Sequence, residues 1–195
     1  HLSDRGLSDS VQAIYGAAPL MEFSSGYVAR FTGPKTQIDV EFINPFIKAV
    51  VETLKTQCSV EVEPGQAFLK TKNHKQDIDV AASLNLKSSV FNGSICLGLN
   101  KPFFLKIMNN MIGEDRKEIS QDLIDGIAEV LNITFGVAKR DLNEKNYKIE
   151  KAIPQVIEGV EINNLFNNNR IGVMLPFRYK DSKKVECHLL ILLNS

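Results

Sequence analysis

The feature that most constrains the fold of this chain is a long proline-free run with helical periodicity, from Ser120 to Asn143 (SQDLIDGIAEVLNITFGVAKRDLN). Ser120 is a suitable N-cap, and Asp122 places a carboxylate in the first turn, where the helix dipole favours negative charge. At about 100° per residue the apolar side chains fall on one broad arc. This arc consists of Leu123, Ile124, Ile127, Val130, Leu131, Thr134, Phe135, Ala138 and Leu142. The run therefore predicts a long amphipathic helix with one face buried in a core.

The opposite arc of this helix carries Asp125, Glu129, Asn132, Gly136 and Lys139. Glu129 and Asn132 are three residues apart, so their side chains are neighbours on the outward face. Gly136 follows on the same face, although a glycine inside a helix costs about 1 kcal/mol relative to alanine. One physical use of that glycine is to let another surface approach the backbone beside Asn132. By itself, a Glu–Asn pair on a polar helix face is most often only solvated.

Composition excludes several classes of function. Lys plus Arg and Asp plus Glu number 23 each, so the formal net charge is zero and no basic excess argues for nucleic acid. No apolar run reaches the ~18 residues of a membrane span, so we expect no membrane partner. The three cysteines are far apart and show neither metal-ligand spacing nor a disulfide framework. This pattern fits a reducing compartment, so we expect a cytoplasmic protein whose partners are proteins or small molecules.

The first 37 residues differ from the remainder of the chain. They are rich in Ala, Gly and Ser, lack a strong period, and contain no asparagine, which is abundant after residue 43. They also lack the basic start and apolar core of a signal peptide. We therefore expect residues 1–37 to be a weakly ordered extension or a leader of foreign origin, and residues 38–195 to form the functional domain.

Within residues 38–195 the pattern predicts helices and strands that alternate in two similar halves. In the first half we expect a strand at 38–42, a helix with Asn44 as N-cap followed by Pro45, strands at 59–63 and 67–72, and paired strands at 78–86 and 94–99 around a turn at Asn92-Gly93. A helix at 100–112, between Asn100 and Gly113, leads to the long helix. After the long helix we expect an extended stretch at 147–157, a polar loop at 163–169, and a closing hairpin of 170–177 with 184–193. This order favours an α+β fold in which helices pack on an antiparallel sheet.

The motif search finds little that could carry chemistry alone. There is no phosphate-binding glycine loop, GxSxG, HExxH or CxxC motif. His188, beside Cys187 in an apolar strand, is more simply a core or sheet-face histidine. If the chain is an enzyme, its reaction must need few groups. A carboxamide such as that of Asn132 could orient an attacking water, because its oxygen accepts and its NH2 group donates a hydrogen bond.

The string Glu129-x-x-Asn132-x-x-x-Gly136-x-Ala138 resembles the signature of the CheC/CheX/FliY phosphatases of bacterial chemotaxis, which dephosphorylate the response regulator CheY. The resemblance spans about residues 38–195 and is closest to the CheX type. It also rests on the segments Phe42-Ile43-Asn44-Pro45-Phe46, Gly113-Glu114, Gly126-Ile127-Ala128-Glu129 and Ile153-Pro154-x-Val156-Ile157.

This resemblance implies a CheC-like fold with pseudo-duplicated helix–strand halves and hydrolysis of phosphorylated CheY. It implies that Glu129 contacts the regulator's active-site lysine and that Asn132 enters its phosphorylation site. We expect Asp125, Ile133, Gly136 and Lys139 to contact the same partner. The family implies no cofactor of the chain's own, since the Mg2+ belongs to the regulator. It also implies a homodimer, for which apolar strands near Pro154 and at the C-terminus supply an edge that needs cover.

Two alternatives compete with a phosphatase. The same fold could bind a response regulator without hydrolysing its phosphate, or it could be a structural component like the flagellar switch proteins. A second pair, Glu41-x-x-Asn44, has the same bare spacing as Glu129 and Asn132. Because Asn44 precedes a proline and is a suitable N-cap, we interpret this second pair as structural.

Overall fold

The computed structural model describes residues 40–70, 76–88, 92–150, 152–167, 170 and 172–193, together with four short strands before them. Those strands are β1 (Met21–Phe23), β2 (Gly26–Val28), β3 (Phe31–Gly33) and β4 (Thr36–Ile38). They form two separate pairs, β1 with β2 and β3 with β4. The remainder of residues 1–37 lies outside the described residues, so a dispensable N-terminal extension stays a prediction.

The centre of the described structure is one antiparallel sheet. Its strands are β5 (Val62–Pro64), β6 (Phe68–Leu69), β7 (Val80–Lys87), β8 (Asn92–Leu99), β9 (Gln155–Ile157), β10 (Gly172–Tyr179) and β11 (Val185–Leu193). They follow the order β5-β10-β11-β8-β7-β9, and β6 also pairs with β10. Every pairing is antiparallel.

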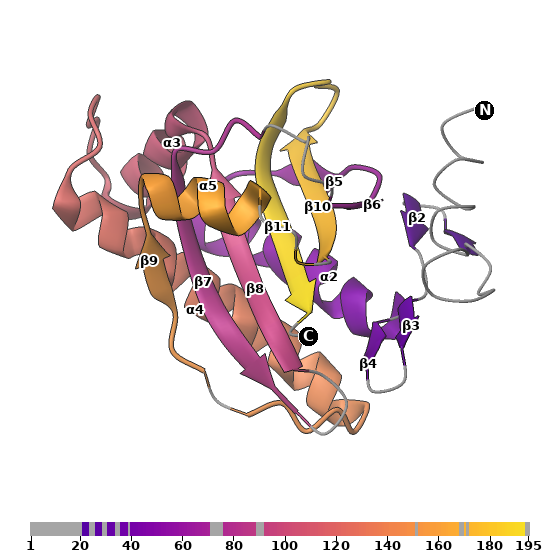
Figure 1. Ribbon diagram of the computed structural model, residues 1–195. Helices are drawn as coiled ribbons and strands as arrows, with labels where there is room; N and C mark the ends of the chain where they lie inside the picture. The colour runs from indigo at the N-terminus through magenta and orange to yellow at the C-terminus, as the bar shows by residue number, and fades with distance from the viewer. Residues whose placement is uncertain are drawn as a thin grey trace.

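Helices cover both faces of this sheet unequally. The helices α2 (Val40–Cys58), α3 (Lys101–Ile112) and α4 (Gln121–Glu144) pack on one face, and the short helix α5 (Val160–Asn167) lies across the other (Figure 1). The α+β architecture predicted from the sequence is therefore confirmed.

The two halves of the chain repeat one arrangement. Each half supplies a long helix, a short strand and a hairpin, namely α2, β5 and β7–β8, then α4, β9 and β10–β11. The second strands of the hairpins, β8 and β11, meet at the centre of the sheet. Each short strand pairs with the first strand of the other half's hairpin, β5 with β10 and β9 with β7. The expected duplication is thus visible in the sheet order.

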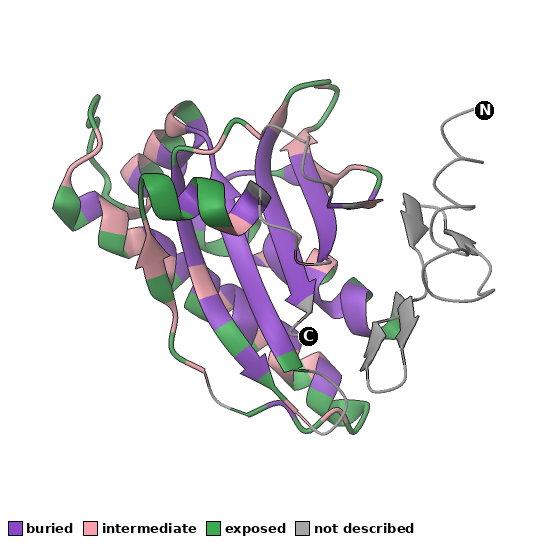
Figure 2. Cartoon of the chain, in the orientation of Figure 1, coloured by how far each residue is buried: buried purple, intermediate pink, exposed green. Residues whose placement is uncertain are grey.

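Alternation along the strands builds two cores. In β11, Leu189 and Ile191 belong to the large cluster beneath the three helices, whereas Leu190 and Leu192 belong to a smaller cluster on the other face. Figure 2 shows the resulting buried centre of the sheet, with exposed residues on the outer sides of the helices. Ile162 and Phe166, four residues apart on α5, are buried in the smaller cluster.

The start of the first long helix was predicted wrongly. α2 begins at Val40, so of the strand expected at 38–42 only Ile38 lies in a strand, as the last residue of β4, and Asn44 is not an N-cap. Pro45 lies inside the helix, where it has no N–H to donate to the carbonyl of Glu41. Phe42 and Phe46 are fully buried, and their rings contact at a centroid distance of 5.4 Å. Burial of this aromatic pair extends the helix beyond the boundary that the proline indicates.

Three further predictions were wrong in part. The loop expected at 163–169 is mostly helix α5, because Phe166 gains burial against the sheet. Asn92 and Gly93 pair with Lys87 and Leu86 inside the hairpin, so they are not its turn. The C-terminal strand β11 is central rather than an edge, whereas β9, directly after Pro154, does lie at an edge. By contrast, α3 is capped as predicted, since Asn100 accepts a hydrogen bond from the Phe103 amide.

Candidate functional site

The long helix α4 is held tightly by its apolar arc. Most of the residues of this arc are buried, as the periodicity predicted, namely Leu123, Ile127, Val130, Leu131, Thr134, Phe135, Ala138 and Leu142. Ile124, which was expected on the same arc, is only half-buried. A Cβ added at Gly126 would lie 2.4 Å from the sulfur of Met108, so this glycine permits close packing against α3. The helix is therefore a rigid support for the side chains on its outward face.

The outward face of α4 presents Glu129 and Asn132 side by side to solvent. Neither side chain makes a hydrogen bond or an ion pair with another described residue. A carboxylate is acceptor-only, and a carboxamide both accepts and donates. The pair therefore offers both kinds of hydrogen-bonding group to a molecule that approaches this face.

A shallow, open depression of about 360 Å³ lies directly beside this pair. α4 contributes Asp125, Ala128, Glu129 and Asn132, and the segment that leads into β9 contributes Ala152, Ile153 and Pro154. No basic side chain is among these lining residues. The depression thus has a polar, acidic side on the helix and an apolar side on the segment 152–154.

The segment 152–154 is placed by the connection that follows α4. The side chain of Asn143 accepts a hydrogen bond of 2.7 Å from the Ile149 amide, and the Glu150 amide donates to the Lys87 carbonyl at 3.0 Å. The strand β9 then pairs with β7 along the sheet edge. These bonds return the chain to the same face of α4 that carries Asn132.

The structure brings some of the expected partner-contacting residues together and leaves others apart. Asp125 lines the depression with Glu129 and Asn132, whereas Ile133, Gly136 and Lys139 do not. Gly136 is exposed, and a Cβ added there would meet no atom within 4 Å. Lys139 lies over the ring of Phe135, with its Nζ atom 5.9 Å from the centroid, and Ile133 is half-buried. Partner contact by these four residues stays a prediction.

Ile153 is the site residue that the sequence analysis missed. Its segment was noticed as a resemblance, but only the fold shows that it lies beside Asn132, 21 residues earlier in the chain. The available signal was a β-branched residue directly before Pro154, in a stretch already expected to be extended.

The second Glu-x-x-Asn pair has a different setting. Glu41 and Asn44 are both exposed on α2, and Glu41 forms an ion pair with Lys145 at the end of α4. Lys48 and Asp141 form another ion pair of 2.9 Å. These two bridges show that α2 and α4 run antiparallel. Glu41 is therefore used within the fold, although Asn44 is not the N-cap that we expected.

Buried titratable groups lie away from the depression. Burial lowers the pKa of His188 to about 4, and its Nδ1 atom has no hydrogen-bond partner among the described residues. Burial raises the pKa of Cys58 to about 11 and that of Cys96 to about 12. These thiols are therefore protonated and inert at neutral pH.

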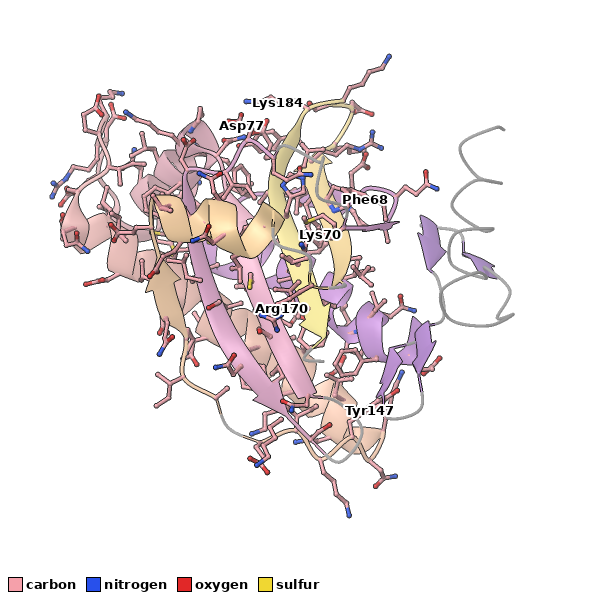
Figure 3. All side chains as sticks on the ribbon, viewed as in Figure 1. Phe68, Lys70, Asp77, Tyr147, Arg170 and Lys184 are labelled. Atoms are coloured by element: carbon pink, nitrogen blue, oxygen red, sulfur yellow. The ribbon has the colours of Figure 1, made fainter. Side chains whose placement is uncertain are left out.

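A cationic pair lies on the sheet face opposite α4. Burial, followed by the nearby charge of Arg170, lowers the pKa of Lys70. Arg170 donates a hydrogen bond of 3.3 Å to Ser94, whose strand neighbour Cys96 belongs to the smaller core. Figure 3 labels both cationic side chains over the sheet on the side of α5. They are thus separated from the depression by the sheet itself.

The part of the chain that the structure describes contains no group of three or more His, Cys, Asp or Glu side chains suited to hold a metal ion. Within the same residues, no helix is long and apolar enough to cross a membrane. The candidate site is therefore a surface of α4 and the segment 152–154, without a metal-binding cluster of its own.

Comparisons with known proteins identify the family of the chain. The family model of the chemotaxis phosphatase CheX matches residues 80–178, a range that includes α4 and the segment 152–154. No curated protein matches the chain.

Three solved structures illustrate the structural similarity. The chemotaxis protein CheX from Vibrio vulnificus is 26% identical, with a TM-score of 0.69 over 80% of this chain and 100% of that one. A CheC-like superfamily protein from Shewanella sp. PV-4 is 27% identical, with a TM-score of 0.68 over 81% and 100%. The CheX–CheY–BeF3–Mg2+ complex from Borrelia burgdorferi contains a chain 19% identical, with a TM-score of 0.59 over 79% and 98%, and this likeness concerns the fold alone.

Proposed function

The chain belongs to the CheX family of chemotaxis phosphatases, and on that premise we propose that it hydrolyses the aspartyl phosphate of a phosphorylated CheY-type response regulator. The observation that carries this proposal is the exposed pair of Glu129 and Asn132 on a rigid helix beside an open depression. A CheX protein of the same fold is known in complex with CheY, BeF3 and Mg2+, which supports a regulator of this type as the partner.

Asn132 is proposed to orient the attacking water. Its Oδ1 atom would accept a hydrogen bond from the water, and its Nδ2 group would donate to an oxygen of the phosphoryl group. The water oxygen forms a bond to phosphorus while the bond from phosphorus to the aspartyl oxygen breaks. The bonding electrons leave with the regulator's carboxylate, and inorganic phosphate is released with both protons of the water. Since an amide does not ionise, this role requires no change in the protonation of Asn132.

Glu129 is proposed to fix the two proteins in register. Its carboxylate makes no bond within the described fold, so it is available to a cation across the interface. The resemblance assigns that cation to the lysine of the regulator's active site. An exposed ion pair contributes about 0–1 kcal/mol, whereas a close pair desolvated in an interface can couple by about 1.5–7 kcal/mol.

The reaction's Mg2+ is proposed to arrive with the regulator. Bound there, it would supply charge neutralisation at the phosphoryl group. The chain itself then needs only a side chain that reaches the phosphoryl group and a surface that holds the regulator. An exposed amide on a rigid helix meets the first need, and the adjoining depression meets the second.

The deciding experiment measures release of inorganic phosphate from a phosphorylated CheY-type regulator with and without this protein. We expect release to accelerate in proportion to the amount of protein added. In parallel, binding to the same regulator loaded with BeF3 and Mg2+ is measured by titration. Tight binding without accelerated release would show that the protein is a binding module and not a phosphatase. If the protein neither binds the regulator nor accelerates release, a CheY-type regulator is not its partner.

A homodimer is a further part of this proposal. β9 is a short edge strand, and its outer side is not paired with any described residue. Light scattering at micromolar concentration should give twice the mass of one chain. A monomer mass would count against this part while leaving the phosphatase proposal intact.

A further inference from the structure

The apolar side of the depression has an unusually exposed member. Ile153 retains 80% of its surface accessible to water, more than Val160 at 74% or Ile112 at 45%. Of these three exposed aliphatic residues, Ile153 alone lines the depression beside Asn132. Its exposure leaves apolar area in water that a partner could remove.

Ile153 is held in place rather than carried on a free end. Its neighbours Ala152 and Pro154 are half-buried, and Ala152 packs against the main core. Upstream, the Glu150 amide is bonded to the Lys87 carbonyl, and downstream β9 is paired with β7. A β-branched side chain on a backbone held in this way has few rotamers to lose, so it can be buried by a partner at little entropic cost.

The charges around Ile153 select the kind of partner. Asp125 and Glu129 border the same depression, and none of the described residues that line it is basic. A matching surface must therefore bring a basic group to the acidic side and an apolar side chain to Ile153. A second copy of this chain, docked through the same face, would instead bring four carboxylates together, since a two-fold interface opposes a patch to itself.

We propose that Ile153 is a docking residue, which packs against an apolar patch on the receiver domain of the response regulator beside its phosphorylation site. This inference rests on the proposed function and names a further contact for the same partner. While Asn132 acts on the phosphoryl group, Ile153 holds the regulator from the other side of the depression. It therefore contributes to affinity, and Asn132 to turnover.

The test compares Ile153→Ser with Val160→Ser. Both changes replace an exposed β-branched aliphatic residue by the same small polar one, but Val160 lies on α5 and does not line the depression. Each variant is titrated against a CheY-type regulator loaded with BeF3 and Mg2+, and kcat and KM for phosphate release are measured separately. The mass of each variant is measured by light scattering.

We expect Ile153→Ser to raise Kd and KM about tenfold, with kcat and mass unchanged, because it removes apolar contact without touching the amide. Val160→Ser should leave all four quantities unchanged. If Ile153→Ser binds like the wild type, or if both variants weaken binding equally, the inference is wrong. A change in mass on Ile153→Ser would overturn it as well, since Ile153 would then belong to an interface between copies of the chain.

The outcome for Ile153 is separable from that of the proposed function. If the wild type releases phosphate and Asn132→Ala does not, but Ile153→Ser is normal, the function stands and the docking role falls. If the wild type binds the BeF3-loaded regulator without hydrolysis and Ile153→Ser weakens that binding, the docking role stands and the phosphatase falls.

Discussion

The two long helices of this protein carry the same Glu-x-x-Asn spacing in opposite settings. On α2, the pair is near the start of the helix, directly before Pro45, and Glu41 is bound to Lys145. On α4, the pair is in the middle of the helix beside a depression, and neither side chain is bonded within the described fold. In this duplicated fold, Glu41 therefore helps to hold the two helices together, whereas Glu129 is available to a binding partner.

The hairpins of the two halves differ in a related way. At the central contact of the sheet, His188 on β11 lies opposite Gly98 on β8. Gly98 leaves room for Phe166 and Ile78, since a Cβ added there would lie 2.9 Å from both. The second half thus carries a buried imidazole opposite a position at which the first half carries no side chain. Identical topology leaves room for different chemistry, because each position is decided by its own neighbours.

The difference between the two helices is tested most directly by removing the side-chain amide of Asn132 on α4 and that of Asn44 on α2. Asn132→Ala should lower phosphate release about 100-fold, which corresponds to ~2.7 kcal/mol of barrier. Affinity for the BeF3-loaded regulator should be largely retained, because orienting water acts on the transition state. Asn44→Ala is the matched control on α2 and should hydrolyse normally. Equal losses in both variants, or a normal rate for Asn132→Ala, would contradict the assignment of water positioning to α4.

The contrast between the hairpins predicts a pH dependence of stability. The pKa of His188 is about 4 in the folded protein and 6.5 unperturbed, so between these values the unfolded chain binds more protons. The free energy of unfolding should therefore fall as pH drops from 7.5 to 5, by about 2 kcal/mol from this residue. Urea denaturation of the wild type and His188→Gln at both pH values measures the difference. If the two proteins lose stability equally, His188 does not carry the effect.

The acidic residues of the two pairs should separate affinity from stability. Glu129→Ala should lower kcat/KM about tenfold, and the loss should shrink as salt rises, because salt screens a partly exposed pair. Glu41→Ala should leave kcat/KM unchanged and cost at most ~1 kcal/mol of stability, the usual limit for an exposed ion pair such as Glu41–Lys145. Steady-state kinetics at two salt concentrations, with thermal melts, decide between these outcomes.

Local periodicity was enough to predict α4, α3 and the closing hairpin, because in each the apolar spacing, caps and turn residues agree. It failed where tertiary burial overrides local preference. Pro45 indicated a helix start, but the buried pair of Phe42 and Phe46 extends α2 to Val40. Asparagines indicated a loop at 163–169, but residues up to Asn167 belong to helix α5, whose Ile162 and Phe166 are buried against the sheet. Neither the start of α2 nor helix α5 could be predicted from its own sequence, because the buried surface depends on contacts with segments far away in the chain.

The candidate site was predictable to the same extent. Helical spacing alone places Glu129 and Asn132 on one exposed face, and the structure confirms that exposure. The approach of Ile153 depends on the pairing of β9 with β7, a contact between distant segments that no local pattern encodes. The role of the pair in hydrolysis came from the family resemblance and stays a prediction.

The smallest expected effect concerns the two glycines of α4, Gly126 and Gly136, whose replacement by alanine should change stability in opposite directions. Gly136→Ala should raise the free energy of unfolding by up to about 1 kcal/mol, because a methyl group there meets open space and alanine favours the helix. Gly126→Ala should lower it, since the added methyl group would collide with the sulfur of Met108.

Gly136 thus has no structural use within the described fold, and we expect its use to be close approach of the regulator. Gly136→Ala should then raise KM severalfold while it stabilises the protein. Paired measurements of melting and KM test this opposition, and a more stable variant with an unchanged KM would show that the regulator does not approach the helix at this turn.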